Sequence, residues 1–322
     1  MWMFLIRKKL THFDTHCSGL TYKTSLSFTS SNSSFSECVR HSHHRFNHFI
    51  LENSDNPPCS SETIYGRCTY RTTGPSLSGS GPFLFTDTDF ILCKHNGENV
   101  YGGAIDCTEG DLTITRCSFL QCSCSNRGGA VSFRSDGKCN QEDNLYLKCS
   151  ADVASGAFDS YEWGKSPNNY QNSCTFIGNS ANLYYGHICI EYSADICVDS
   201  NMYIRGSSHG EHDACAGSVA QFTSSHLVTY SNCIFSKGSA NSYGGGIGTY
   251  EPYESNASPY FYFSYFSNNV CSDQNRGADF DANGTTGNYF SEDKIIHCFS
   301  SSRGLRIHIG GQDTSDVDNW LP

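Results

Sequence analysis

Short apolar runs separated by turn residues recur along the chain, and they predict β-strands. Examples are LTITRCSF at Leu112–Phe119, LVTYSNCIF at Leu227–Phe235 and PYFYFSYF at Pro259–Phe266. These runs are rich in β-branched or aromatic residues and are bounded by Gly, Asn and Ser, as strands usually are. A helical repeat would need two apolar stretches at a spacing of 3.6, each about ten residues long, and no unit supplies them. The pattern therefore predicts an all-β protein.

The apolar runs belong to an internal repeat. An aromatic residue is followed three positions later by Cys, Asn or Gly, and a Gly-small-apolar element comes a few residues further on. The leading positions recur every 25 to 32 residues, and they are Phe35, Tyr65, Phe90, Phe119, Tyr146, Phe176, Tyr203, Phe235, Phe266 and Ile295. The residues three positions later are Cys38, Cys68, Cys93, Cys122, Cys149, Asn179, Gly206, Gly238, Asn269 and Cys298. Variable spacing indicates a fixed core with connecting loops of adjustable length.

The glycine element of the repeat is clearest in the central units. Its glycines are Gly103, Gly129, Gly156, Gly186, Gly217, Gly245 and Gly277. Glycine at the opening of a strand allows a close backbone approach. The element is absent or displaced before Phe90, so we expect irregular first coils, as the capping of an exposed stack end requires.

Residues three apart on an extended strand face opposite sides, so the aromatic residue and the Cys, Asn or Gly cannot both point inward unless the chain bends. We predict a corner between them. Stacked coils of this kind form a right-handed parallel β-helix, here of about ten coils of about 29 residues. We expect residues 1–30 to form an irregular amino-terminal cap, residues 31–310 the β-helix, and residues 311–322 a carboxy-terminal tail.

Charge and cysteine content exclude several classes of function. The formal net charge is −11, so nucleic acid is not expected as a partner. The chain has 18 cysteines but no CxxC pair, and the closest two are Cys122 and Cys124, which lack the spacing of a structural zinc site. Cys is a compact apolar residue that fits a tight corner. We therefore predict stacked thiols rather than a disulfide web, and no bound metal or cofactor.

The first ten residues, MWMFLIRKKL, place basic residues after the apolar stretch, which reverses the order of a secretory signal peptide. No later segment reaches the ~18 apolar residues of a membrane span. We therefore expect no transmembrane span in the chain. It is soluble and internal, leaves the cell by another route, or is a fragment of a longer surface protein; the sequence does not separate these alternatives.

The repeat resembles that of a known family. FxxN occurs at Phe176–Asn179 and Phe266–Asn269, GGAI at Gly102–Ile105, and the near match GGAV at Gly128–Val131. Alternation of FxxN with GGAI resembles the repeat of the polymorphic outer-membrane proteins of chlamydial surfaces and of similar trichomonad proteins, over about residues 35–310. The resemblance implies a right-handed parallel β-helix on a cell surface, associated with adhesion. Family members typically also carry a secretion signal and a membrane-anchoring carboxy-terminal region, neither of which this sequence shows.

Some β-helices are polysaccharide lyases or glycoside hydrolases, so an enzyme is the main alternative. A glycosidase needs two carboxylates that flank the substrate. The candidates are Asp279 with Asp281, and Asp106 with Asp159, which follow apolar motif residues and would lie on one face two coils apart. No adjacent Asp-Asp pair or basic substrate clamp accompanies them, so we predict no catalytic residue. We interpret His187 as a variant at the Ala position of the motif rather than as part of a Gly-His-Gly element.

Two histidine groups raise a metal hypothesis, since imidazole clusters bind zinc or nickel. They are His41, His43, His44 and His48, and His209 and His212 with Asp213. Both lie in predicted solvated loops, so no metal is assigned. Asn32, Asn256 and Asn283 begin N-x-S/T sequons, which matter only if the chain enters a secretory pathway.

The sequence thus predicts a non-enzymatic cell-surface or extracellular scaffold whose variable loops contact host-cell proteins or glycans. A polysaccharide-active enzyme and a truncated copy of a repeat surface protein remain the alternatives. Carboxylates clustered within about 10 Å on one face would favour the enzyme.

Overall fold

The described part of the chain is an all-β stack. The computed structural model describes residues 68–71, 74–79, 82–161, 169–191, 195–210, 216–222, 228–242, 244–250, 260–272, 279–283, 295–296, 299–300, 307–309 and 312–314. The chain divides into two units, Met1–Asp55 and Asn56–Pro322, and every described residue belongs to the second. The described residues contain strands and no helix, which confirms the predicted class.

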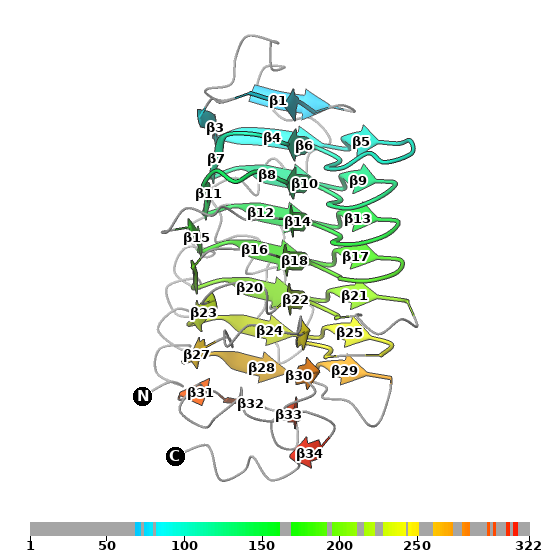
Figure 1. The fold of residues 1–322 in the computed structure, drawn as a ribbon, viewed down its shortest axis with the longest axis vertical. Coiled ribbons are helices and arrows are strands. Elements are labelled where there is room, and N and C mark those ends of the chain that lie inside the picture. The colour runs from blue at the N-terminus through cyan, green and yellow to red at the C-terminus, as the bar shows by residue number, and fades with distance from the viewer. Residues whose placement is uncertain are drawn as a thin grey trace, which may run out of the picture. The chain divides into compact units, whose positions relative to one another are not determined.

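Four sheets, named A to D here, run along the stack (Figure 1). Sheet A contains β1 (Cys68–Arg71), β4 (Thr88–Ile91), β8 (Ser118–Leu120), β12 (Leu145–Leu147), β16 (Thr175–Ile177), β20 (Met202–Ile204), β24 (Ile234–Ser236), β28 (Tyr265–Ser267) and β32 (Phe299–Ser300). Sheet B contains β2 (Ser76–Leu77), β6 (Ile105–Cys107), β10 (Val131–Phe133), β14 (Phe158–Tyr161), β18 (Ile188–Glu191), β22 (Val219–Phe222), β26 (Ile247–Tyr250), β30 (Phe280–Asn283), β33 (Ile307–Ile309) and β34 (Gln312–Thr314).

The other two sheets are shorter. Sheet C contains β3 (Pro82–Thr86), β7 (Asp111–Thr115), β11 (Cys139–Glu142), β15 (Asn169–Asn172), β19 (Ile196–Asp199), β23 (Val228–Ser231), β27 (Tyr260–Tyr262) and β31 (Ile295–Ile296). Sheet D contains β5 (Lys94–His95), β9 (Ser123–Cys124), β13 (Ser150–Ala151), β17 (Ser180–Ala181), β21 (Ser207–Ser208), β25 (Ser239–Ala240) and β29 (Val270–Cys271).

The coils from β3 to β30 pass through sheets C, A, D and B in that order, as β7, β8, β9 and β10 do. Strands of one sheet lie one below another in Figure 1, and they pair in parallel except for the antiparallel pair β33 and β34. Parallel pairing of equivalent strands from successive coils defines a parallel β-helix, so the predicted fold class is confirmed.

The leading aromatic residues form a ladder inside sheet A. Register pairs Phe90 with Phe119, Phe119 with Tyr146, and so on through Phe176, Tyr203, Phe235 and Phe266. Neighbouring rings stack with centroids 4.6 to 5.1 Å apart and planes within 17° of parallel. The strand spacing of a parallel sheet, about 4.8 Å, holds like rings at this contact distance and so builds the core.

The predicted corner after the aromatic residue is present. The residue two positions after it has a positive φ in every coil from Phe90 to Phe266: Leu92, Gln121, Lys148, Gly178, Arg205, Lys237 and Asn268. A second such corner joins sheets C and A, at Asp87, Arg116, Asp143, Ser173, Ser200, Asn232 and Phe263. A left-handed residue turns the strand sharply, so each of these coils bends on both sides of sheet A.

Cys and Asn do the same work at these corners. The Sγ of Cys149 lies 3.5 Å from the carbonyl oxygen of Phe119 in the preceding coil, and the Nδ2 of Asn179 donates at 3.2 Å to that of Tyr146. The Oδ1 of Asn179 also accepts from the backbone N–H of Cys149. Both residue types thus satisfy a buried carbonyl between coils, which explains why either can occupy this position of the repeat.

The glycine element allows the coils to approach closely. A Cβ built on Gly129 would collide with the carbonyl oxygens of Gly156 and Ser150. The same kind of collision with carbonyl oxygens of the next coil would occur at Gly103, Gly156, Gly186 and Gly217. At Gly206 and Gly238 the collision would be with a carbonyl oxygen across the same coil, that of Gly217 and of Gly245. Only a residue without a side chain fits there.

The sequence assignment was wrong near both ends of the stack. Register aligns Tyr70, not Tyr65, with Phe90, and it aligns Cys68 with Thr88 rather than with Cys93. The coil before Phe90 is shorter than the others, so the usual spacing selected the wrong tyrosine. At the other end, Ile295 belongs to sheet C, in register with Phe261. An apolar residue with no aromatic ring could not distinguish sheet C from sheet A.

The described residues give sheet A nine strands, which differs from the predicted count of ten coils, and the predicted unit at Phe35 lies outside those residues. Phe35, Cys38, Tyr65, Gly277 and Cys298 lie outside the described residues, as does the expected cap at 1–30. The expected tail at 311–322 includes β34, which pairs with β33.

Candidate functional site

The charged side chains nearest to a functional arrangement lie on the outer face of sheet B. Register places Asp106, Ser132, Asp159 and Cys189 in one row of successive strands. Residues that precede them, such as Ile105, Val131 and Phe158, belong to the main core, so this row faces away from the core. Asp106 and Asp159 therefore lie on one face two coils apart, as the sequence predicted.

This outer row is nevertheless buried. Asp159 and Ser132 are 0% exposed and Asp106 is 8% exposed. The connections from sheet D to sheet B make their own ladder, in which Arg127 bridges Ala154. Ala154 packs with Cys189, Tyr185 and Ala216 in a second, small apolar cluster. The row is therefore enclosed between sheet B and these connections.

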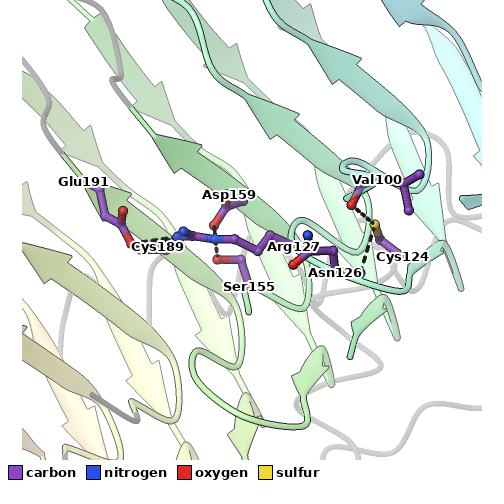
Figure 2. Close-up of polar contacts among 8 residues, drawn as sticks. All are labelled: Val100, Cys124, Asn126, Arg127, Ser155, Asp159, Cys189 and Glu191. Atoms are coloured by element: carbon purple, nitrogen blue, oxygen red, sulfur yellow. Dashed lines mark hydrogen bonds and ion pairs between the residues drawn. The ribbon is translucent and has the colours of Figure 1, made fainter. Parts of the chain in front are cut away.

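Arg127 joins three levels of the stack through one guanidinium group, as Figure 2 shows. Its Nε lies 3.1 Å from Oδ1 of Asp159, and its Nη2 lies 2.6 Å from Oε1 of Glu191. The Oγ of Ser155 donates to the same Oδ1 of Asp159 at 2.7 Å, and the Sγ of Cys189 donates to Oε1 of Glu191 at 3.3 Å. We call these five residues the arginine staple, because they link coils across the stack.

A second ion pair lies one level away from the arginine staple. The Nη2 of Arg134 lies 3.0 Å from both carboxylate oxygens of Asp106. The guanidinium carbon of Arg134 lies 3.8 Å from the centre of the Tyr101 ring, a cation–π contact. The Nδ1 of His95 lies 3.0 Å from the carbonyl oxygen of Tyr101. Asp106 is thus held in place by a single arginine that is itself held by an aromatic ring.

Burial controls the electrostatics of this region. Burial raises the pKa of Asp106, and the hydrogen bond and charge of Arg134 only partly lower it. Burial likewise raises the pKa of Glu191, partly opposed by Arg127. Burial opposes the charge on Arg127, but the charges of Asp159 and Glu191 together raise its pKa. The carboxylates are therefore paired with arginines in a buried region and are not exposed to a substrate.

Three polar atoms around this row have no hydrogen-bond partner among the described residues. They are Oδ2 of Asp159, Oγ of Ser132 and Nε of Arg134. Oδ2 of Asp159 is an acceptor, Nε of Arg134 is a donor, and the hydroxyl of Ser132 can be either. These three atoms make the buried surroundings of the row polar. They do not supply the accessible pair of carboxylates that glycoside hydrolysis requires.

The alternative carboxylate pair does not form a site. Asp279 is 0% exposed, and its Oδ1 accepts a hydrogen bond of 2.8 Å from Nδ2 of Asn269 in the interior. A carboxylate enclosed in the core cannot contact a polysaccharide. The side chain of Asp281 lies outside the described residues.

His187 replaces the alanine of the motif, as the sequence interpretation held, and its ring lies in the interior. The ring lies beside the stacked rings of Phe176 and Tyr203, with centroids 6.0 and 6.1 Å away. The Nδ2 of Asn179 lies 3.0 Å from Nδ1 of His187. Because an amide NH2 group only donates, Nδ1 of His187 is the acceptor. A Cβ on Gly206 would lie 2.7 Å from Nε2 of His187. Gly206 thus provides the space that the imidazole occupies.

The metal hypotheses find no support within the described part of the chain. No group of three or more His, Cys, Asp or Glu side chains there is arranged to hold a metal ion. The carbonyl oxygen of His209 accepts from Nδ2 of Asn241. The first histidine group, His212, Asp213 and the sequons at Asn32 and Asn256 lie outside the described residues, and Asn283 ends β30.

Buried cysteines contribute hydrogen bonds rather than cross-links. Cys122 and Cys149, neighbours in the corner row, are both thiols and not disulfide-bonded. The Sγ of Cys124 donates to the carbonyl oxygen of Val100 at 3.3 Å and accepts from the backbone N–H of Asn126 at 3.5 Å (Figure 2).

Among the described residues, none forms a helix of the length and hydropathy that a bilayer crossing needs.

Sequence reasoning missed Arg127, Arg134, Glu191 and Tyr101. Each stands one to three residues from a glycine or apolar motif position, where the residue types differ from coil to coil. Their contacts join residues 28 to 64 positions apart, so only the register of the stack brings them together. The alternation of inner and outer positions expected along a strand is the signal that places Asp106 and Asp159 together on the outer face of sheet B.

The fold and this site define a parallel β-solenoid whose charged side chains join coils. Comparison with protein-family models, with curated proteins and with solved structures finds no match for the chain. Function is therefore argued from the residues themselves.

Proposed function

We propose that the protein is a non-enzymatic scaffold, displayed at a cell surface or outside the cell, whose connections between sheets contact host-cell proteins or glycans. One observation carries the proposal: the carboxylates closest to a catalytic pair are bound by arginines between coils. Arg127 holds Asp159 and Glu191, and Arg134 holds Asp106. The resemblance of the FxxN and GGAI repeats to those of the polymorphic outer-membrane proteins supports the surface location and the adhesive role.

Antibody labelling of intact source cells tests this proposal. Antibodies raised against residues 100–300 should label unpermeabilised cells, with an antibody to an internal protein as the negative control. Signal that appears only after permeabilisation would contradict a surface location and would favour a truncated copy of a repeat surface protein.

A polysaccharide-active enzyme is the second candidate, and two observations favour it. Asp106 and Asp159 share an outer row, and carboxyl groups with raised pKa values, such as those of Asp106 and Glu191, are frequent in active sites. Purified protein incubated with a panel of plant, fungal and bacterial polysaccharides should release no new reducing or unsaturated ends. Release that disappears in Asp106→Asn, with the fold retained, would establish the enzyme instead.

A further inference from the structure

The coil that contains β27 and β28 turns four aromatic residues outward around one corner. Tyr260 and Tyr262 occupy outer positions of β27 and are half-buried, whereas Phe261 between them is in the core. The Tyr260 and Tyr262 ring centroids lie 6.1 Å apart and their planes are within 13° of parallel. Phe263 follows at the corner, and Tyr265 begins β28 in an outer position. We call Tyr260, Tyr262, Phe263 and Tyr265 the aromatic corner.

Phe263 is unusual for its position in the fold. Its φ is 49°, in the left-handed region, where a bulky aromatic residue is strained. The equivalent residues of the other coils are Asp87, Arg116, Asp143, Ser173, Ser200 and Asn232. The Phe263 side chain is also 37% exposed, so core burial does not account for an aromatic residue here. Backbone strain at an exposed aromatic residue points to a role in contact with a ligand.

Polar groups adjoin the aromatic corner in the preceding coils. Register aligns Tyr262 with Ser231, and Ser231 with Asp199. The Oγ of Ser231 and the Nδ2 of Asn232 both donate to Oδ1 of Asp199, at 2.5 and 2.9 Å. A hydroxyl and an amide therefore lie in the coil next to the rings, and a carboxylate bonded to both lies one coil further along the stack.

The two outer rows of sheet C that contain Tyr260 and Tyr262 carry no positive charge that would attract an anion. In the described strands from β7 to β27, the paired outer positions are Thr113 and Thr115, Asn140 and Glu142, Tyr170 and Asn172, Cys197 and Asp199, Thr229 and Ser231, and Tyr260 and Tyr262. None is Lys or Arg, and two are acidic. Such a surface disfavours anionic ligands, whether nucleic acid or acidic sugar.

We infer that the aromatic corner binds an uncharged glycan, with sugar rings packed on Tyr262 and Phe263 and sugar hydroxyl groups bonded to Asp199, Ser231 and Asn232. Aromatic side chains combine a large apolar face with little conformational entropy, and carboxylate and amide groups accept and donate to hydroxyls. The inference rests on the proposed scaffold function and specifies its ligand class and the surface that binds it.

Binding of purified full-length protein to soluble neutral glucan, xylan and mannan, measured by affinity electrophoresis, tests the inference. At least one of these polysaccharides should retard the wild-type protein, whereas heparin should not. Tyr262→Ala and Phe263→Asn should weaken that binding by about tenfold or more. Tyr170→Ala, an outer tyrosine of the same sheet three coils away from Tyr260, is the matched control and should bind like the wild type.

Phe263→Asn separates a binding role from a structural one. Asn tolerates the left-handed conformation, as Asn232 and Asn268 do in this protein. This variant should therefore resist urea at least as well as the wild type while losing the glycan. No binding of the wild type to any neutral polysaccharide, preference for heparin, or unchanged binding by both variants would overturn the inference. Because these assays use purified protein, their outcome does not depend on where the protein is located. Failure of glycan binding can therefore be distinguished from failure of intact-cell labelling.

Discussion

Arg127 is the residue on which the arginine staple depends. Its guanidinium group compensates two carboxylates, of which Asp159 is completely buried. Removal of one partner of a buried ion pair leaves an uncompensated charge, which is far more costly than loss of the attraction itself. An exposed pair in the same protein, Arg116 with Asp87, offers a direct comparison.

Arg127→Met should lower the free energy of unfolding by about 3–5 kcal/mol at pH 7.5. Arg116→Met, the control, should lower it by at most about 1 kcal/mol because that pair is exposed to solvent. Burial already raises the pKa of Glu191, so folded Arg127→Met binds protons more readily than its unfolded chain. Its stability relative to the wild type should recover as pH falls through that raised pKa. Urea unfolding at pH 7.5 and pH 5 measures both effects, and equal losses for the two variants would contradict a buried staple.

His187 should make the fold sensitive to acid. Burial lowers its pKa to about 3, whereas the imidazole of the unfolded chain titrates near its usual value of about 6.5. The unfolded state therefore binds a proton that the folded state does not, and stability falls as pH drops from about 6.5 towards 3, by up to about 1.4 kcal/mol per pH unit. His187→Ala, which restores the motif residue, should remove this component of the slope. An unchanged slope in urea titrations over that range would show that His187 is not responsible.

At the scale of the strand and its corners, two rows of small polar residues connect one coil to the next. Asn201 illustrates the role: its Oδ1 accepts the backbone N–H of Cys174 at 2.7 Å, and its Nδ2 donates to the carbonyl oxygen of Gln171 at 3.2 Å. Cys233, at the same corner of the next coil, has its Sγ 3.6 Å from the carbonyl oxygen of Val198. Asn supplies a donor and an acceptor, whereas Cys supplies mainly a weak donor.

Asn201→Ala should leave a buried N–H and a buried carbonyl without partners and destabilise the protein by about 2–3 kcal/mol. Asn201→Cys keeps the donor and should lose less. The free energies of unfolding should therefore rank Asn above Cys above Ala at this position. Thermal and urea denaturation provide the measurement, and equal losses for the Cys and Ala variants would refute the shared role of the two residue types.

The repeat was predictable wherever an aromatic residue, a corner residue and a glycine all occur together. Phe119, Cys122 and Gly129 carry all three signals, and the structure places them at the ladder, the corner and the close approach between coils. Prediction failed at Tyr65 and Ile295, where one or two of the signals are missing. The corner row that includes Asn201 was not recognised, because the left-handed residues before it are of many types. Contacts such as that of Arg127 with Glu191 depend on register, which local sequence does not specify.

At the scale of the whole stack, the protein is modular. The coils from β3 to β30 contribute equivalent strands to the four sheets, and each such coil pairs with the coils on either side. Stability of such a solenoid is approximately a sum over coils and the interfaces between neighbouring coils. The proposed glycan binding involves outer positions only, while the ladders inside remain the same from coil to coil.

Removal of one coil in register tests this central claim most directly. Register aligns Met202 with Ile234, so deletion of residues 203–234 joins equivalent positions and leaves the arginine staple intact. His187 also keeps a glycine neighbour, because Gly238 takes the place of Gly206. The control deletion, 203–233, leaves one extra residue, which would turn the side chains of β24 to the wrong face.

Urea unfolding of the two deletion variants, followed by circular dichroism, is the measurement. We expect a single cooperative transition for the deletion of 203–234, at a moderately lower midpoint than the wild type, and no folded baseline for the deletion of 203–233. Equal behaviour of the two variants, whether both fold or both fail, would contradict a stack of interchangeable coils in the register described.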